Sequence, residues 1–342
     1  MESAIPNRLQ CPRSRQRRIP DDYVPPYPGF VARHAPGISH VIMAYFGIQF
    51  RQLGDGVSEA CKTLVDAFAL SHGPGHWDRA QWQDERGYHN VIFAAYWDEP
   101  TRYDAWLPLH GLSWARVPRP GIGTFLEVLR PHVTRYETLL GHPTAVEGIA
   151  ALADGISGPI QEHGYWGAAR DRIPASQYDA LHSTESPTFE RDGSYVRVHA
   201  QDDLCLIRSG QDWLETEGDE RRMYLDTLEP ILRRGMEFLR DEGLPGGCLC
   251  SRYVTVQDVH GRATEKSYGM SWWRNLASLE RWAESHPTHV AIFGAATDYF
   301  QKFGENARIK LYHEVTLSRR DEQLFEYLNC HEYTGLLRAM PR

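Results

Sequence analysis

The sequence predicts an α+β fold in which two duplicated ferredoxin-like halves form one pseudo-symmetric body of the dimeric α/β-barrel type. Three observations support this fold class. The length of 342 residues suits two domains, or one large body built from two similar halves. Strand-like and helix-like segments alternate along the chain. A pattern of two tryptophans and a histidine also occurs twice, 176 residues apart.

The repeated pattern is a tryptophan, a second tryptophan nine residues later and a histidine four residues after that: Trp97, Trp106 and His110, then Trp273, Trp282 and His286. In both places a predicted strand leads into a predicted helix. Tryptophan is rare, so duplication of one strand–helix unit explains the match. The alternative is two unrelated units that share a tryptophan-anchored helix.

The first half is predicted to span residues 31–190, after an N-terminal arm over residues 1–30. The proline-rich end of this arm favours an extended, polyproline-like segment on the surface. β-branched and aromatic residues predict strands over 38–50 and 88–97. Apolar spacing, and Pro100 in a first helical turn, predict helices over the ranges 57–70, 99–106 and 121–130.

The second half is predicted to span residues 191–342 and to form one compact unit with the first. A long helix is expected over 217–240, bent by Pro230, and a second helix over 275–285. Strand-like runs occupy the ranges 195–198, 204–207, 266–272 and 311–315.

Composition excludes several classes of protein. Hydrophobic residues make up 42% and charged residues 24%, which is ordinary for a globular protein. Lys plus Arg is 37 and Asp plus Glu is 45, a net charge of −8, so a nucleic-acid partner is not expected. A membrane span is not expected either, because no apolar run is long enough. The basic N-terminal run leads into prolines rather than a signal-peptide core, and the six cysteines lack framework spacing, so we expect a reduced cytoplasmic protein.

Common catalytic motifs are missing. The sequence has no glycine-rich dinucleotide loop, no Walker A loop, no His-Glu-x-x-His and no Gly-x-Ser-x-Gly. Candidate chemistry therefore depends on individual residues.

His289 is specific to one half, because the equivalent position of the first half is Ser113. Such asymmetry is expected of a ligand added to a duplicated scaffold, although a packed or surface histidine is the alternative. His313 lies on a predicted strand, where a hydrogen-bonded core residue is the alternative. Ser209 is expected to close the strand 204–207 at a pocket rim, or to be an ordinary turn serine. Arg170 and Arg172 flank Asp171, with which surface ion pairs are possible.

Together, several ordered segments resemble the haem-containing aldoxime dehydratases. The segments are 164–174 (GYWGAARDRIP), 206–210 (LIRSG), 286–289 (HPTH) and 311–315 (LYHEV), with an opening at 20–28 (PDDYVPPYP) and an ending at 329–338 (NCHEYTGLLR). The resemblance extends from about residue 19 to the C-terminus.

This resemblance implies the dehydration of aldoximes, R–CH=N–OH, to nitriles on non-covalent, ferrous haem b, with the oxime nitrogen bound directly to iron. It implies His289 as the axial iron ligand, so the haem belongs to the second half. The implied catalytic residues are His313, Ser209, one of Arg170 and Arg172, and a supporting Glu137. It also implies a homodimer, and leaves the choice between alkyl and aryl aldoximes open.

Two alternatives remain at this point. One is a haem-binding relative that acts as a haem carrier, a sensor or a peroxidase-like enzyme. This class would share His289 but would not need Ser209, His313 and an arginine together. The other is a haem-free interaction protein built on the same duplicated scaffold.

Overall fold

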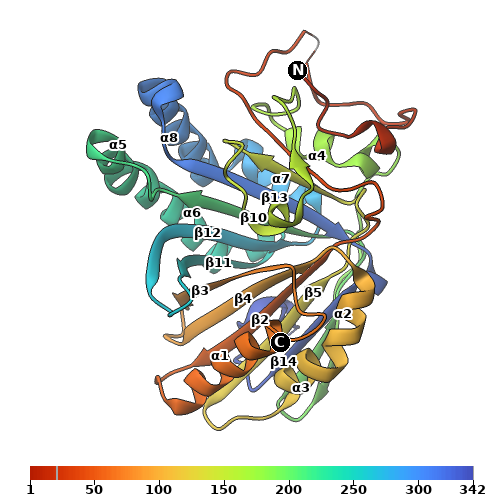
Figure 1. Ribbon diagram of the computed structural model, residues 1–342, viewed down its shortest axis with the longest axis vertical. Coiled ribbons are helices and arrows are strands. Elements are labelled where there is room, and N and C mark those ends of the chain that lie inside the picture. The colour runs from red at the N-terminus through yellow and green to blue at the C-terminus, as the bar shows by residue number, and fades with distance from the viewer. Residues whose placement is uncertain (21, 342) are drawn as a thin grey trace.

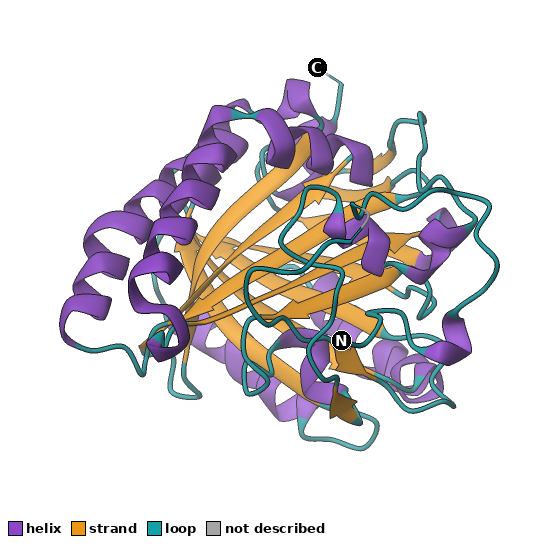
Figure 2. Cartoon of the chain, turned by 90° about the horizontal axis from the view of Figure 1, so that it is seen from above, coloured by secondary structure: helices purple, strands orange, loops and turns teal. Residues whose placement is uncertain are grey.

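The structure is a computed structural model that describes residues 1–20 and 22–341. Its largest element is a sheet of twelve strands in which every neighbouring pair is antiparallel. Figure 2 shows the strands fanning between helices on either side. From edge to edge the strands are β6 (Tyr136–Leu140), β13 (Lys310–Ser318), β10 (Leu204–Asp212), β12 (Ala263–Trp273), β11 (Cys248–Gln257), β3 (His76–Gln83), β4 (His89–Trp97), β2 (Ile42–Phe50), β5 (Ile122–Leu129), β14 (Gln323–Leu328), β9 (Tyr195–His199) and β8 (Thr188–Asp192). A separate short pair joins β1 (Ala32–Arg33) to β7 (Gly155–Ile156).

Two groups of helices cover the sheet. Figure 1 shows the first group beside β2 and β5, and the second beside β10 and β12. The first group is α1 (Asp55–Phe68), α2 (Pro100–Trp106) and α3 (Leu112–Arg116). The second is α5 (Gly218–Met223), α6 (Glu229–Glu242), α7 (Leu276–Ser285) and α8 (Pro287–Phe303). A short helix, α4 (Ala168–Arg172), lies in the long connection between the two groups. No helix in the described part of the chain is long and apolar enough to cross a membrane.

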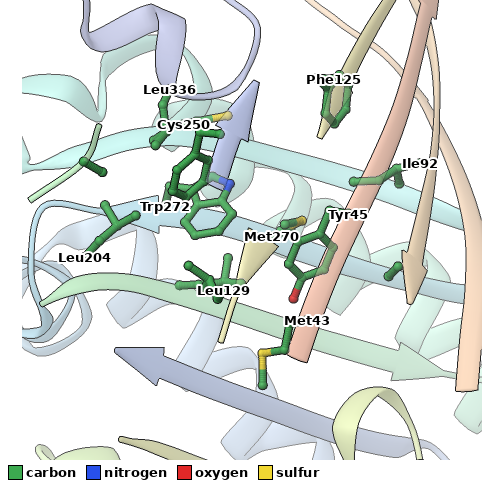
Figure 3. Close-up of a cluster of buried hydrophobic side chains, with 14 of the residues drawn as sticks. Met43, Tyr45, Ile92, Phe125, Leu129, Leu204, Cys250, Met270, Trp272 and Leu336 are labelled. Atoms are coloured by element: carbon green, nitrogen blue, oxygen red, sulfur yellow. The ribbon is translucent and has the colours of Figure 1, made fainter. Parts of the chain in front are cut away.

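The sheet curves around an apolar interior. Along β2, Met43 and Tyr45 point inward, whereas Ile42, Ala44 and Phe46 pack beneath the first helix group. Figure 3 shows Tyr45 facing Trp272, and their ring centroids are 6.2 Å apart. Across the interior, Tyr96 of β4 donates a hydrogen bond of 2.8 Å to Glu314 of β13. Strands that are not neighbours in the sheet therefore face each other.

Most predicted elements are confirmed, but the predicted helix over 121–130 is wrong. This stretch forms β5, between β2 and β14, and every residue of the strand is buried. Ile122, Phe125, Leu126 and Leu129 have helical spacing, which explains the error. A strand that is buried on both faces carries apolar residues throughout, so its periodicity does not distinguish it from a helix.

Two stretches of the chain share one strand order. β2 to β5 lie in the order β5-β2-β4-β3, and β10 to β13 lie in the order β13-β10-β12-β11. β3 and β11 pair and join the two stretches. The repeated tryptophans pack alike, with ring centroids 5.4 Å apart for Trp97 and Trp106 and 5.6 Å apart for Trp273 and Trp282. The repeated sequence pattern therefore occupies equivalent positions.

Two further differences from the sequence predictions concern candidate site residues or the elements near them. β10 continues to Asp212, so Ser209 lies inside a strand and does not close one. The predicted helix over 217–240 contains a π-helical turn over Tyr224–Leu228, which ends two residues before Pro230. Asp21, within the predicted N-terminal arm, and Arg342 lie outside the described residues.

Candidate active site

His289 lies in the first turn of α8 with one ring nitrogen fixed. Its Nδ1 is 2.8 Å from the carbonyl oxygen of Ala283, to which an Nδ1–H donates. This hydrogen bond leaves Nε2 as the nitrogen available to a metal, the usual arrangement for a histidine ligand. Burial lowers the pKa of His289, which favours the neutral form that binds metals.

His286, the other histidine of this segment, serves the fold. It is the N-cap residue of α8, and its Nδ1 accepts a hydrogen bond from the backbone N–H of Thr288. Its ring stacks on Phe238 with the centroids 4.1 Å apart. The two histidines lie three residues apart in the sequence but have different partners: His286 caps α8, and His289 contacts the carbonyl oxygen of Ala283.

The surroundings of His289 fit a haem. Its ring contacts Trp282 at 4.6 Å and Trp166 at 5.9 Å, and Trp166 packs on Phe293 at 4.8 Å between centroids. Trp166 and Phe293 are each 41% exposed, and Val290 is 47% exposed. A porphyrin would cover such an apolar surface around a single imidazole, because it supplies the four equatorial ligands of its iron itself.

His313, Arg172 and Glu137 form a charged cluster on three different elements. Nε2 of His313, on β13, lies 2.8 Å from Nη2 of Arg172 and 3.1 Å from Oε1 of Glu137. Nε of Arg172, at the end of α4, donates 2.6 Å to Oε2 of Glu137, on β6. Arg172 and Glu137 are buried, whereas the His313 side chain is 24% exposed. The cluster therefore holds one edge of an imidazole that a ligand can still reach.

Electrostatics keep Glu137 ionised. Burial alone would raise the pKa of this carboxyl, but Arg172 and His313 outweigh burial and lower the pKa below its ordinary value. Nε2 of His313 thus has both a donor and an acceptor beside it. The neutral ring can accept from Arg172, and the protonated ring can donate to Glu137.

Ser209 lies directly opposite His313. The two residues are partners in the antiparallel register of β10 and β13, so both side chains point to the same face of the sheet. On this face Ile207 and Val315 pack in one cluster with Ile292 of α8. Ser209 and His313 therefore lie on the sheet surface against which Ile292 of α8 packs.

Arg170 points elsewhere. Its guanidinium forms a bidentate pair with Glu280 of α7, at 2.8 and 2.7 Å, and donates 2.9 Å to the carbonyl oxygen of Ala180. It thus ties α4 to α7. Of the two candidate arginines, only Arg172 contacts His313 and Glu137.

The N-terminal arm holds α4 in place. The buried carboxylate of Asp171 accepts hydrogen bonds from the backbone N–H groups of Arg18 and Ile19, at 2.8 and 2.9 Å. The same oxygen accepts 2.9 Å from the hydroxyl of Tyr165. Asp171 is thus no surface ion-pair residue, and the arm fixes the helix that carries Arg172.

Two residues near this cluster were missed as candidates from the sequence. His163 precedes the GYWG segment, and Tyr27 belongs to the proline-rich opening. Their rings lie 5.3 Å apart, and Tyr27 stacks on Phe300 of α8 at 6.0 Å. Tyr27 lies inside one of the segments that carry the family resemblance and His163 directly precedes another, and this position was the signal that could have identified them.

Comparisons with known proteins show the family to which the chain belongs. The family model for haem-containing dehydratases matches residues 44–336. The chain is 41% identical to an aliphatic aldoxime dehydratase of Rhodococcus erythropolis, across 99% of this chain and 98% of that one. It is 32% identical to a phenylacetaldoxime dehydratase of Bacillus sp. (strain OxB-1), across 94% of each chain.

Solved structures of aldoxime dehydratases share the fold of this chain. A crystal structure of an aldoxime dehydratase has a TM-score of 0.92 and 40% identity, and covers 99% of this chain and 98% of that chain. A second aldoxime dehydratase, crystallised with butyraldoxime, has a TM-score of 0.94 and 40% identity, with 99% and 96% covered. Since the family model spans most of the sequence and relatives match it from end to end, the chain belongs to the family of haem-containing dehydratases.

Proposed function

We propose that this protein is a haem-dependent aldoxime dehydratase, which converts R–CH=N–OH to R–C≡N and water. The observation that carries the proposal is the cluster of His313, Arg172 and Glu137, with Ser209 opposite His313. A haem carrier or sensor would need His289, but its function would not require the charged cluster of His313, Arg172 and Glu137. The butyraldoxime complex of a 40% identical relative adds support.

The proposed cofactor is haem b, bound without a covalent link, with His289 as the axial ligand. When bound in its ferrous state, it would supply an iron that binds the oxime nitrogen and gives electron density to the N–O bond as that bond breaks. Trp166, Trp282 and Phe293 would give the porphyrin an apolar surface to pack on around His289.

The protein's own residues would move the protons. Hydroxide is a poor leaving group, so the oxime oxygen needs a proton, and His313 can donate it from Nδ1 while Nε2 remains anchored. Glu137 stabilises the protonated ring. His313 then takes up the proton that the aldoxime carbon loses, so the proton count balances. The Ser209 hydroxyl would hydrogen-bond the same oxygen.

Replacing Arg172 by lysine is expected to lower kcat far more than replacing Arg170 by lysine. Lysine keeps the charge but cannot contact Glu137, His313 and the Glu162 carbonyl oxygen together, as Arg172 does. Losing one charged hydrogen bond of this kind costs about 1.5–3 kcal/mol, or roughly 10- to 100-fold in rate. The matched Arg170→Lys variant should stay within about threefold of the parent. Equal losses in both variants would contradict the assignment of Arg172.

Turnover is expected to depend on the oxidation state of iron. The dithionite-reduced protein should form nitrile from butyraldoxime under anaerobic conditions, whereas the ferric protein should not, because only ferrous iron is proposed to bind the oxime nitrogen. Phenylacetaldoxime, assayed in parallel, would compare aryl with alkyl substrates. Nitrile is measured by gas chromatography with and without reductant, and equal rates would rule out the ferrous mechanism.

We also propose that the chain consists of two ferredoxin-like halves, residues 31–190 and 191–342, in one compact unit with residues 1–30 as an arm. The identical strand orders of β2–β5 and β10–β13 support a duplication. β8 extends across the boundary at 190, so that limit is approximate. A homodimer is proposed from the family resemblance. A cytoplasmic location is proposed because every cysteine in the described residues is a free thiol.

A further inference from the structure

His163 is a buried imidazole without a hydrogen-bond partner on either ring nitrogen among the described residues. Its side chain is 0% exposed. Gly29 of the arm leaves room for it, since a Cβ at Gly29 would lie 2.9 to 3.1 Å from atoms of the ring. Buried polar groups of native proteins are nearly always paired, so a ring with two unpaired nitrogens has room for a partner that the described residues do not supply.

The ring lies next to the charged cluster. Arg172, which contacts His313, donates a hydrogen bond of 2.7 Å from Nη1 to the carbonyl oxygen of Glu162, the residue before His163. On another side Tyr27 packs against His163, and Tyr27 also stacks on Phe300 of α8. His163 is thus placed between Arg172 and the helix that bears His289.

The chemistry of the ring narrows the class of partner. Burial, together with the positive charge of Arg172, lowers the pKa of His163 to about 4, so the ring is neutral near pH 7. A neutral imidazole offers one N–H donor and one acceptor nitrogen. A carboxylate could satisfy only the donor, and an ammonium group only the acceptor. A hydroxyl group or a water molecule can satisfy either.

We propose that His163 is a further substrate-site residue, whose imidazole hydrogen-bonds the hydroxyl oxygen of the bound aldoxime or the water that this oxygen becomes. This inference rests on the proposed dehydratase function and assigns a second imidazole to the same oxygen that His313 protonates. The aldoxime and the released water both offer a hydroxylic oxygen. They differ in the step of the reaction at which His163 would act.

The test compares His163→Gln with His163→Met in the haem-loaded protein. The two replacement side chains are similar in length, but only glutamine has a donor and an acceptor. Loss of one hydrogen bond between neutral groups predicts a fall of about tenfold in kcat/KM for His163→Met, with most of the activity kept in His163→Gln. If the partner is the aldoxime hydroxyl, the lower kcat/KM comes from a higher KM. If the partner is the released water, it comes from a lower kcat.

His34→Met is the control. Within the part of the chain that the structure describes, His34 also has two unpartnered ring nitrogens. Burial lowers its pKa to about 4, but its ring packs against Tyr136 rather than beside Arg172. This variant should match the parent in haem content and kinetics.

Equal kinetics in His163→Gln and His163→Met would overturn the proposal, whether both match the parent or both fall. Loss of haem in His163→Met alone would also overturn it, because His163 would then hold the cofactor. A parent protein that forms no nitrile would instead remove the proposed function. These results are distinguishable, since haem content is read from the Soret band and activity from nitrile formation.

Discussion

Replacing His313 by alanine is expected to abolish nearly all nitrile formation while leaving the haem in place. His313 is the proposed donor of the proton to the oxime oxygen, and loss of a positioned general acid typically costs about 10²- to 10⁴-fold in rate. The residue lies on β13, a strand of the sheet, and is anchored by Arg172 and Glu137. Because it does not hold the iron, the Soret band and the binding of aldoxime should persist.

The measurement is the single-turnover rate of nitrile formation by the reduced variant. His199→Ala is the matched control, since His199 also lies on a strand and pairs with a glutamate, with its Nε2 3.1 Å from Oε1 of Glu190 on the edge strand β8. The control should keep the parent rate. A His313→Ala protein within about threefold of the parent would remove His313 from the mechanism.

Replacing His289 by alanine is expected to give a folded protein with little haem. His289 is the proposed axial ligand, and its Nδ1 contact with Ala283 leaves Nε2 free for iron. Loss of the iron–nitrogen bond should also remove activity, because the substrate can no longer meet a correctly held iron. Haem content is measured by the pyridine haemochrome assay, and folding by far-ultraviolet circular dichroism.

His286→Ala provides the comparison for this variant. His286 caps the first turn of α8, and loss of such a cap costs about 0.5–2 kcal/mol of stability. This variant should therefore unfold at a lower temperature but keep most of its haem. If His286→Ala were the haem-poor protein and His289→Ala the haem-rich one, the two roles would have to be exchanged.

Candidate site residues could be proposed from the sequence, but the way in which the sheet brings them together could not. His313 and Ser209 could be proposed from separate segments, but their pairing depends on the register of β10 and β13, which brings together two residues 104 positions apart. No local pattern encodes that register. β5 was mistaken for a helix because both of its faces are buried.

The choice between Arg170 and Arg172 also required the structure. Both arginines lie within one short helix, and their functions are set by the partners that α4 meets, Glu280 of α7 for one and Glu137 of β6 for the other. Both partners are glutamates that lie far from α4 in the sequence, so the sequence alone does not show which arginine meets which glutamate. Distinguishing His286 from His289 also required the structure. The His286 side chain caps α8, whereas the Nδ1 contact of His289 with Ala283 leaves its Nε2 free.

The most direct test of the account is a product analysis of butyraldoxime labelled with ¹⁸O and mixed anaerobically with the reduced, haem-loaded protein. Dehydration predicts one butyronitrile for each aldoxime consumed, with the label recovered in water. Butyraldehyde as the main product would show hydrolysis, and an imine or amine would show reduction of the N–O bond by iron. Either result would contradict the proposal that His313 and its partners expel the oxime oxygen as water.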